Sequence, residues 1–241
     1  MKTVLITGAT SGIGERLAND YAEQGWSVIA CGRSAGKLSQ LSEHDNISSL
    51  AFDISDQQEV AAAADKIDKT LDLVILNAGT CEYMDDIQRF DTELFRRVIN
   101  INVLGTADCA AAFLPKIPRG GQLALMGSSA SFFPFSRAQA YGASKAAVSY
   151  LAQSMAVDLA KFEIAVSLVS PGFVETPLTD KNDFEMPMKI SVEQASAEII
   201  KGLSKRKQHV TTPRLFTFLL GLLGKLPHSI QHWLALRTVK A

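Results

Sequence analysis

Short runs of apolar residues alternate along the chain with longer segments in which apolar residues recur at helical spacing. Several short runs are apolar throughout, which is typical of parallel strands covered on both faces. The predicted strands are Thr3–Thr7, Ser27–Cys31, Ser48–Phe52, Leu71–Leu76, Gln122–Met126 and Ile164–Val169, with a weaker one at Gln208–Thr211. The predicted helices are Gly14–Gln24, Gly36–Glu43, Gln57–Lys69, Thr92–Phe113, Gln139–Phe162 and Val192–Ser204.

Because strands and helices alternate, we expect an α/β fold: a Rossmann-type, doubly wound parallel sheet of about seven strands with helices on both faces. A further helical segment begins near Pro213, a residue that suits the first turn of a helix. The sequence contains no low-complexity linker and no fixed repeat. We therefore expect a single domain over residues 1–241 with a short helical C-terminal extension.

Composition argues against a nucleic-acid-binding, disulfide-stabilised or metal-binding protein. With 241 residues, 47% of them apolar, the chain can bury one large core, and its net charge of −1 gives no field that would attract nucleic acid. Cys31, Cys81 and Cys109 are odd in number and widely spaced, and no acidic residue lies between His228 and His232. Neither a disulfide framework nor a metal site is expected. The first residues resemble a strand and not a signal peptide, which favours a cytoplasmic protein.

The first predicted strand runs directly into a glycine-rich turn, TGATSGIG, and a helix follows. Glycines allow a tight turn close to a pyrophosphate, and the helix N-terminus offers unpaired N–H groups to the anion. At the first strand–helix junction of an alternating chain, such a turn predicts a dinucleotide site. The residues expected to contact the cofactor here are Gly8, Thr10, Ser11, Gly12, Ile13 and Gly14.

The second predicted strand ends without the carboxylate that binds the ribose 2′-hydroxyl of NAD. Arg33 and Ser34 stand there instead and suit a 2′-phosphate; the alternative is that Arg33 is a solvated surface residue. We therefore favour NADP(H) over NAD(H). Later segments are placed to complete the site, with Asp53 and Ile54 near the adenine and Asn77, Ala78 and Gly79 closing the fourth strand.

Tyr141 and Lys145 lie four positions apart in the stretch QAYGASKAA, so a helix would place the phenol and the ammonium on one face. The residues around them are small and would let a flat ligand or a second helix approach closely. The alternative is an ordinary amphipathic helix in which Tyr141 packs and Lys145 is solvated.

Taken in order, these segments resemble the short-chain dehydrogenase/reductase family in its single-domain branch. The motifs that carry the resemblance are TGATSGIG, FDISD, NAG, INVLG, GSS, YGASK and SPGFVET, and they extend from Thr7 to about Thr176. The chain has Leu76 where the family commonly has a second asparagine before Asn77. We accordingly expect residues 1–135 to form mainly the cofactor half, 136–212 the catalytic helix and substrate side, and 213–241 a helical tail.

The resemblance implies a role for four catalytic residues. Tyr141 matches the general acid/base, and Lys145 matches its partner, which favours the phenolate and holds the nicotinamide ribose. Ser128, thirteen residues before Tyr141, matches the serine that binds the substrate carbonyl, and Ser129 is its near competitor. Asn102 matches the asparagine that anchors a water behind Lys145. Tyr141 and Lys145 are thus expected to contact the cofactor as well.

The resemblance also assigns the segment after the sixth strand to the nicotinamide, with Thr176 bonding its carboxamide. The residues of this segment expected at the cofactor are Pro171, Gly172, Val174 and Thr176, and those expected at the substrate are Ser128, Tyr141 and Phe173. The implied reaction is hydride transfer between NADPH and a ketone or aldehyde, with oxidation of a secondary alcohol as its reverse. Phenylalanines and methionines in 131–140 and 178–190 favour an apolar substrate.

Two rival functions fit parts of the sequence. A serine hydrolase would use Ser128, but GSSA lacks the second glycine of a nucleophile elbow and no histidine is placed to activate it. A non-enzymatic NADP sensor would not need the complete catalytic set. A panel of carbonyl compounds separates the enzyme from the sensor, because a sensor would bind NADPH tightly without turnover.

Two surfaces are expected to meet partners. The resemblance implies a homodimer or homotetramer in which the helices around Asn102 and Tyr141 pair with their copies through Ala110, Ala111, Ala112, Ala146 and Ala147. The tail helix is apolar except for a stripe of Thr217, Gly221 and Gly224, and it is too short to span a bilayer. It could form a lid, a subunit contact or an interfacial membrane helix. The first two are favoured, because the basic cluster Lys205–Lys207 is short.

Overall fold

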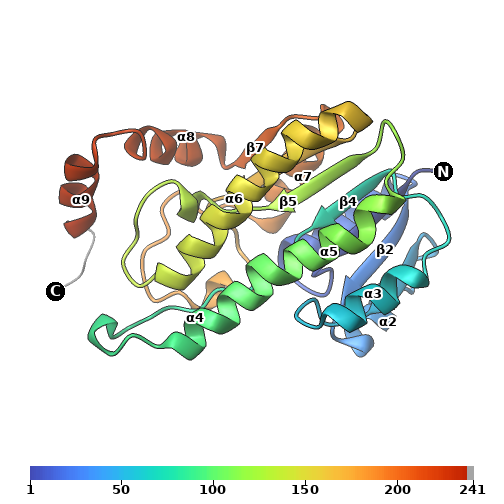
Figure 1. Ribbon diagram of the computed structural model, residues 1–241, viewed down its shortest axis with the longest axis horizontal. Coiled ribbons are helices and arrows are strands. Elements are labelled where there is room, and N and C mark those ends of the chain that lie inside the picture. The colour runs from blue at the N-terminus through green and yellow to red at the C-terminus, as the bar shows by residue number, and fades with distance from the viewer. Residues whose placement is uncertain (238–241) are drawn as a thin grey trace.

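The computed structural model describes residues 1–237 and shows a seven-stranded parallel sheet (Figure 1). The strand order is β3-β2-β1-β4-β5-β6-β7, with the chain reversing its direction of travel between β1 and β4, as in a doubly wound fold. The strands are β1 (Thr3–Thr7), β2 (Ser27–Gly32), β3 (Ile47–Ala51), β4 (Leu73–Leu76), β5 (Gln122–Met126), β6 (Ala165–Pro171) and β7 (His209–Thr212). All seven predicted strands are therefore confirmed, with ends that move by one or two residues.

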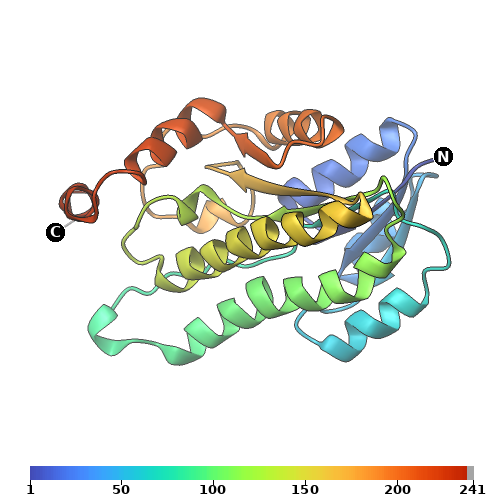
Figure 2. The same ribbon diagram turned by 45° about the horizontal axis from the view of Figure 1, so that its top comes forward.

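Two layers of helices cover the sheet (Figure 2). The α-helices are α1 (Gly12–Glu23), α2 (Ala35–Leu41), α3 (Gln57–Asp65), α4 (Thr92–Ile99), α5 (Gly105–Phe113), α6 (Gln139–Leu159), α7 (Val192–Ser204), α8 (Arg214–Leu223) and α9 (His228–Leu236). One core cluster joins the sheet to α3, α5 and α6 through Val60, Phe113 and Val148. The other joins its opposite face to α1 and α7 through Leu17 and Ile199. The near-continuous apolar strands are thus buried on both faces, as predicted.

The helix predicted over Thr92–Phe113 is interrupted. A turn of π-helix, η2 (Asn100–Leu104), separates α4 from α5. Within it the Asn102 side chain accepts a hydrogen bond from the Thr80 backbone N–H and donates to the Thr80 carbonyl and the Ser144 hydroxyl. A π turn re-aims side chains locally, and such turns are frequent at functional sites. The π turn thus places Asn102 where it bonds to Thr80, in the loop after β4, and to Ser144 on α6.

Short 3-10 turns account for most of the remaining local differences from the sequence-based expectation. They are η1 (Ile87–Arg89), η3 (Leu114–Lys116), η4 (Ser129–Ser131), η5 (Ala160–Phe162) and η6 (Thr179–Lys181). Three of them follow β4, β5 and β6, so they lie in the loops at the carboxyl edge of the sheet. The tail also differs, since it forms two helices, α8 and α9, and not one.

One continuous helical segment, Thr92–Lys116, is long and apolar enough to cross a membrane when only length and composition are considered. It contains α4, η2, α5 and η3. Cys109 and Phe113 on this segment belong to the core against the sheet. Packing against the sheet therefore explains the apolar residues on the inner side of this segment.

Candidate active site

A cleft of about 660 Å³ opens where the carboxyl ends of the parallel strands meet. In an open α/β sheet this edge, at the point where the strand order reverses, is where ligands bind. The predicted site residues that line it are Gly8, Thr10, Ser11, Gly12, Ile13, Arg33, Ser34, Asp53, Ile54, Asn77, Ala78, Gly79, Ser128, Tyr141, Lys145, Pro171, Gly172, Val174 and Thr176. Three other predicted site residues, Gly14, Asn102 and Phe173, are not among the described residues that line the cleft.

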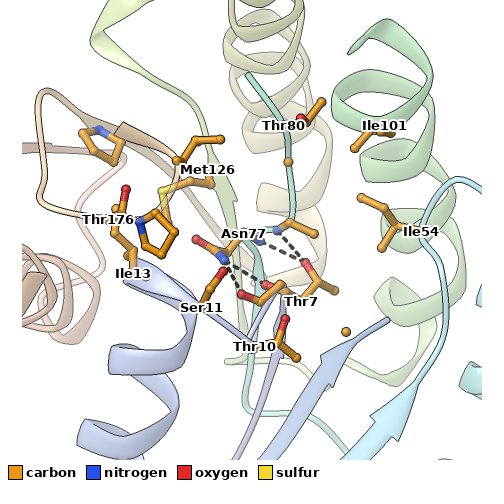
Figure 3. Close-up of a pocket in the computed structure, with 18 of the residues that line it drawn as sticks. Thr7, Thr10, Ser11, Ile13, Ile54, Asn77, Thr80, Ile101, Met126 and Thr176 are labelled. Carbon is orange, nitrogen blue, oxygen red and sulfur yellow. Dashed lines mark hydrogen bonds between the residues drawn. The ribbon is translucent and has the colours of Figure 1, made fainter. Parts of the chain in front are cut away.

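The glycine-rich turn has the backbone that its sequence requires. Gly8 and Gly12 have φ values of +67° and +56°, in the left-handed region that favours glycine. Asn77 holds the turn in place: its backbone N–H donates to the Thr7 hydroxyl, and its side-chain NH₂ donates to the Thr7 and Gly8 carbonyls at 3.0 and 3.2 Å (Figure 3). Asn77, directly after β4, thus shapes the loop that would face a pyrophosphate.

Gly14 has a packing role. A methyl group on Gly14 would overlap the Gly8 carbonyl oxygen and the Asn77 side chain. This glycine therefore lets α1 begin against the glycine turn, the role expected of the third glycine in a dinucleotide fingerprint. Its predicted contact with a cofactor stays a prediction.

The segment after β6 closes over the glycine turn. Thr176 lies beside Gly12, where an added methyl group would come within 3.1 Å of the Thr176 side chain. The Thr179 hydroxyl donates to the Val174 carbonyl at 2.6 Å, and the Thr176 backbone N–H donates to the Thr179 hydroxyl at 3.0 Å. These bonds hold the segment in a compact turn with Thr176 facing the cleft (Figure 3).

The far end of the cleft is basic. Arg33, with 72% of its side chain exposed, approaches Asp53 with an Nη1–Oδ2 distance of 3.5 Å. Burial opposes ionisation of Asp53, but hydrogen bonds from Ser55 and the charge of Arg33 outweigh it and lower the pKa. Ser34 caps α2 by accepting a bond from the Lys37 N–H, and Ser34 itself lines the cleft. Lys37 also lines the cleft, and sequence analysis missed it.

Tyr141 and Lys145 share one face of α6, as their spacing predicts. The Lys145 Nζ lies 5.7 Å from the centre of the Tyr141 ring and donates to the Met126 carbonyl at 2.9 Å. Burial lowers the pKa of the Lys145 ammonium to about 8, although Cys81 opposes the shift. Burial, with Cys81, raises the pKa of the Tyr141 phenol above its usual range, and a hydrogen bond with Ser128 acts in the opposite direction. At neutral pH the phenol therefore holds its proton.

Ser128 and Asn102 support this pair from neighbouring elements. Ser128 is buried at the end of β5, lines the cleft and accepts a bond from the Ala130 N–H at 3.1 Å. Its competitor Ser129 is also buried but is outside the described lining. Asn102 is fully buried, and a methyl group on Gly79 would meet both its Oδ1 and the Lys145 Nζ. The Asn102 amide oxygen and the Lys145 ammonium therefore both lie next to Gly79.

The substrate side contains residues that sequence reasoning did not single out. The Tyr83 hydroxyl donates to the Asn182 Oδ1 at 2.8 Å, and its ring contacts Phe184 edge-on. Arg137 forms ion pairs with Asp85 and with Asp183, both at 2.6 Å. These contacts tie the loop after β4 to the loop after β6. They join segments about a hundred residues apart in sequence, so no local pattern indicates them.

Together these features fit a dinucleotide. One part of the cleft is lined by the positive-φ glycines, the N-terminus of α1 and the basic residues near Arg33. The other part is lined by Tyr141, Lys145 and Ser128. The fold and the site thus define an α/β oxidoreductase domain of the dinucleotide-binding class.

The particular family follows from comparison. The short chain dehydrogenase family model matches residues 2–186, more than half of the chain. The chain therefore belongs to the short-chain dehydrogenase/reductase family, which confirms the resemblance on which the residue roles were based.

Individual relatives agree with this assignment. The chain is 32% identical over 222 residues to an uncharacterized oxidoreductase of Myxococcus xanthus, covering 88% of this chain and 87% of the relative. It is 32% identical over 177 residues to a probable NADP-dependent dehydrogenase of Haemophilus influenzae, covering 70% of each. A solved short-chain dehydrogenase from Sphingobium yanoikuyae, in complex with NADPH, matches with a TM-score of 0.80 and 25% identity over 95% of this chain and 98% of that chain.

Proposed function

We propose that the protein is an NADPH-dependent carbonyl reductase that reduces a ketone or aldehyde, with oxidation of a secondary alcohol as the reverse reaction. The observation that carries the proposal is the convergence of Ser128, Tyr141 and Lys145 on one cleft whose other end holds Arg33. Ser128 and Arg33 follow the carboxyl ends of β5 and β2, and Tyr141 and Lys145 lie on α6, so the fold itself brings them together.

The chain's own groups suit proton delivery to a carbonyl oxygen. The Ser128 and Tyr141 hydroxyls face the same part of the cleft and would hold that oxygen between them. The Tyr141 phenol is protonated at neutral pH and so carries the proton that the carbonyl oxygen would receive; burial, which raises its pKa, opposes the transfer, and a nearby cation favours it. The Lys145 ammonium beside the ring would stabilise the phenolate that remains, and Asn102, which like Lys145 lies next to Gly79, would anchor the water behind the lysine. Bound NADPH would supply the hydride to the carbonyl carbon.

The preference for NADP(H) is supported by charge at the 2′ end of the cleft. Arg33 and Lys37 are both exposed there, and two cations suit a phosphate far better than a ribose hydroxyl. Asp53 pairs with Arg33 only at 3.5 Å with both groups partly solvated, so a phosphate would meet little competition for the guanidinium. The relative named as NADP-dependent and the NADPH-bound structure point the same way.

An apolar substrate is favoured by the aromatic side chains beside the cleft. Phe173 contacts Phe184 and Phe216 with ring centres 6.1 and 5.3 Å apart, and Phe184 continues to Tyr83. This row of rings runs from the loop after β4 to the tail helix α8. A substrate reaching Tyr141 from this side would pass an apolar wall.

The test is NADPH oxidation by the purified full chain with a panel of ketones, aldehydes and quinones that range from small and polar to large and apolar. We expect turnover, highest for the apolar carbonyls, and weaker turnover with NADH. Tight NADPH binding with no turnover across the panel would overturn the proposal and favour an NADP sensor.

A further inference from the structure

The tail helix α8 turns its apolar face to solvent. Its exposed large side chains follow the spacing i, i+3, i+4, i+7, i+8 of one helical face: Leu215, Phe218, Leu219, Leu222 and Leu223. Phe218 is 61% exposed, and Leu215 is 60% exposed. A soluble protein seldom leaves five large apolar side chains together on one helix face without a partner.

The opposite, narrower side of α8 attaches it to the domain. Thr217 is buried and donates to the Pro213 carbonyl, Phe216 packs on Phe173, and Gly224 lies against the Phe132 carbonyl. Two members of the weakly polar stripe predicted from the sequence, Thr217 and Gly224, therefore face the domain, whereas a methyl group on Gly221 would meet open space. A lid was one of the two roles favoured for the wide apolar face, but none of the described residues of α8 lines the cleft.

The last described helix, α9, extends the same exposed apolar character. Ile230, Trp233 and Leu236 are 43%, 51% and 57% exposed, and no described residue of α9 is buried. Gln231 fastens α9 to the end of α8 by donating to the Gly224 and Leu226 carbonyls at 2.9 and 2.7 Å. Both views show α8 and α9 at the end of the molecule that also carries the loops of the substrate side (Figures 1 and 2).

The charged side chains of the segment that forms these helices have one sign. Glu198 is the last acidic residue of the sequence, whereas eight lysines and arginines follow it. Exposed Arg214 and Lys225 lie at the two ends of α8, and the Arg237 guanidinium lies 3.7 Å from the centre of the Trp233 ring. The basic cluster at Lys205–Lys207 is set apart from them, because it precedes β7 and Arg206 bonds the Gly120 carbonyl.

We propose that the exposed faces of α8 and α9 form a docking surface for an anionic lipid bilayer. Leucine, phenylalanine and tryptophan side chains on a short helix enter the boundary between headgroups and acyl chains, while flanking cations contact anionic headgroups. Exposed tryptophan is typical of this boundary. The two helices are too short to span a bilayer, so the contact is peripheral and reversible.

A second copy of the chain suits this surface less well. In a two-fold contact the same patch meets itself, so Arg214, Lys225 and Arg237 of one copy would face those of the other. The tail contains no carboxylate side chain to neutralise them. An anionic bilayer supplies the missing negative charge together with an apolar interior.

The test is co-sedimentation of the full chain with vesicles of phosphatidylcholine containing about 30% phosphatidylglycerol, compared with pure phosphatidylcholine. We expect binding to the anionic vesicles that is stronger by about tenfold or more than to the neutral ones and that weakens as salt is raised. In a Trp26→Phe background, Trp233 emission should shift to the blue on binding. The double variant Phe218→Gln/Leu222→Gln should lose both the pelleting and the shift.

The matched control is Ile87→Gln/Phe162→Gln, which removes two apolar side chains of similar exposure (53% and 51%) from other parts of the molecule. It should pellet as the wild type does, and circular dichroism should show all variants folded. Absence of pelleting of the wild type at low salt would overturn the proposal, as would equal pelleting of the α8 variant. Loss of self-association in the α8 variant, without vesicle binding by the wild type, would instead assign the surface to a second copy.

Discussion

Arg33 stands at the end of the cleft assigned to the cofactor 2′-phosphate, and most of its side chain is exposed. Arg33→Ala should weaken NADPH binding by about 1–3 kcal/mol and leave NADH binding nearly unchanged, because one charge-assisted phosphate contact is lost. Folding should be unaffected, since the exposed pair with Asp53 contributes little. Fluorescence titrations with both cofactors measure this.

Arg96→Ala, on the exposed side of α4, is the control for loss of a surface arginine and should leave both affinities as they are. Equal losses for NADPH and NADH in Arg33→Ala, or a wild-type preference for NADH, would contradict the assignment of Arg33.

Lys145 makes the stability of the cofactor-free protein depend on pH. Its pKa of about 8 in the folded state lies below the value near 10.4 of an unfolded lysine. Between these values the unfolded chain binds more protons, so wild-type stability should rise with pH through this window. Lys145→Met lacks this gain. The difference in the free energy of unfolding between wild type and variant should therefore change by on the order of 3 kcal/mol across the window. Urea unfolding at pH 7 and pH 10 measures it, and identical pH dependence in both proteins would show that the lysine is not desolvated.

Sequence motifs predicted the residues that meet in the cleft, because their backbone positions are set by strand ends and by one helix face. Ser128, Tyr141 and Lys145 are examples. Lys37 could not be singled out, since a lysine in the first turn of a helix is ordinary until the helix is oriented. Tyr83 depends on a contact with Asn182 across two irregular loops, which leaves no periodic signal.

At the level of elements, the junction of β1 and α1 requires the start of the helix, at Gly14, to lie close to the Gly8 carbonyl. Gly14→Ala should destabilise the protein by at least about 2 kcal/mol and weaken NADPH binding, because the added methyl group overlaps the Gly8 carbonyl oxygen. Gly36→Ala, in α2 with open space around it, is the matched control and should be neutral or slightly stabilising. Thermal unfolding of the two variants with and without NADPH compares them, and equal melting temperatures would contradict the packing role of Gly14.

The elements themselves were predictable where a periodic pattern decides them. The helix α7 has the predicted ends, Val192 and Ser204, because an apolar stripe and a serine cap mark it. The π turn at Asn102 was not predictable, since it is stabilised by Thr80 and Ser144, which are distant in the sequence. Periodicity marked the polar stripe of α8 but could not show that Thr217 and Gly224 face the domain while Gly221 does not.

At the scale of the whole molecule, α5 and α6 leave a further surface open. Ala111, Ala146 and Ala147 are exposed, as are Tyr150 and Val157 at 76% each. Ala110, which was expected in the same contact, packs in the core instead. We predict self-association through this surface: light scattering at micromolar concentration should give a dimer or tetramer, and Ala147→Arg should reduce its mass. A monomeric wild type would contradict the prediction.

We propose that Tyr141 delivers the proton in NADPH-dependent carbonyl reduction. The most direct measurement compares wild type and Tyr141→Phe for NADPH oxidation with the best carbonyl substrate of the panel, alongside NADPH affinity and thermal unfolding. We expect turnover to fall by about a hundredfold or more while affinity and stability stay close to wild type, because only the hydroxyl is removed. A phenylalanine variant that keeps most of the wild-type turnover would contradict it.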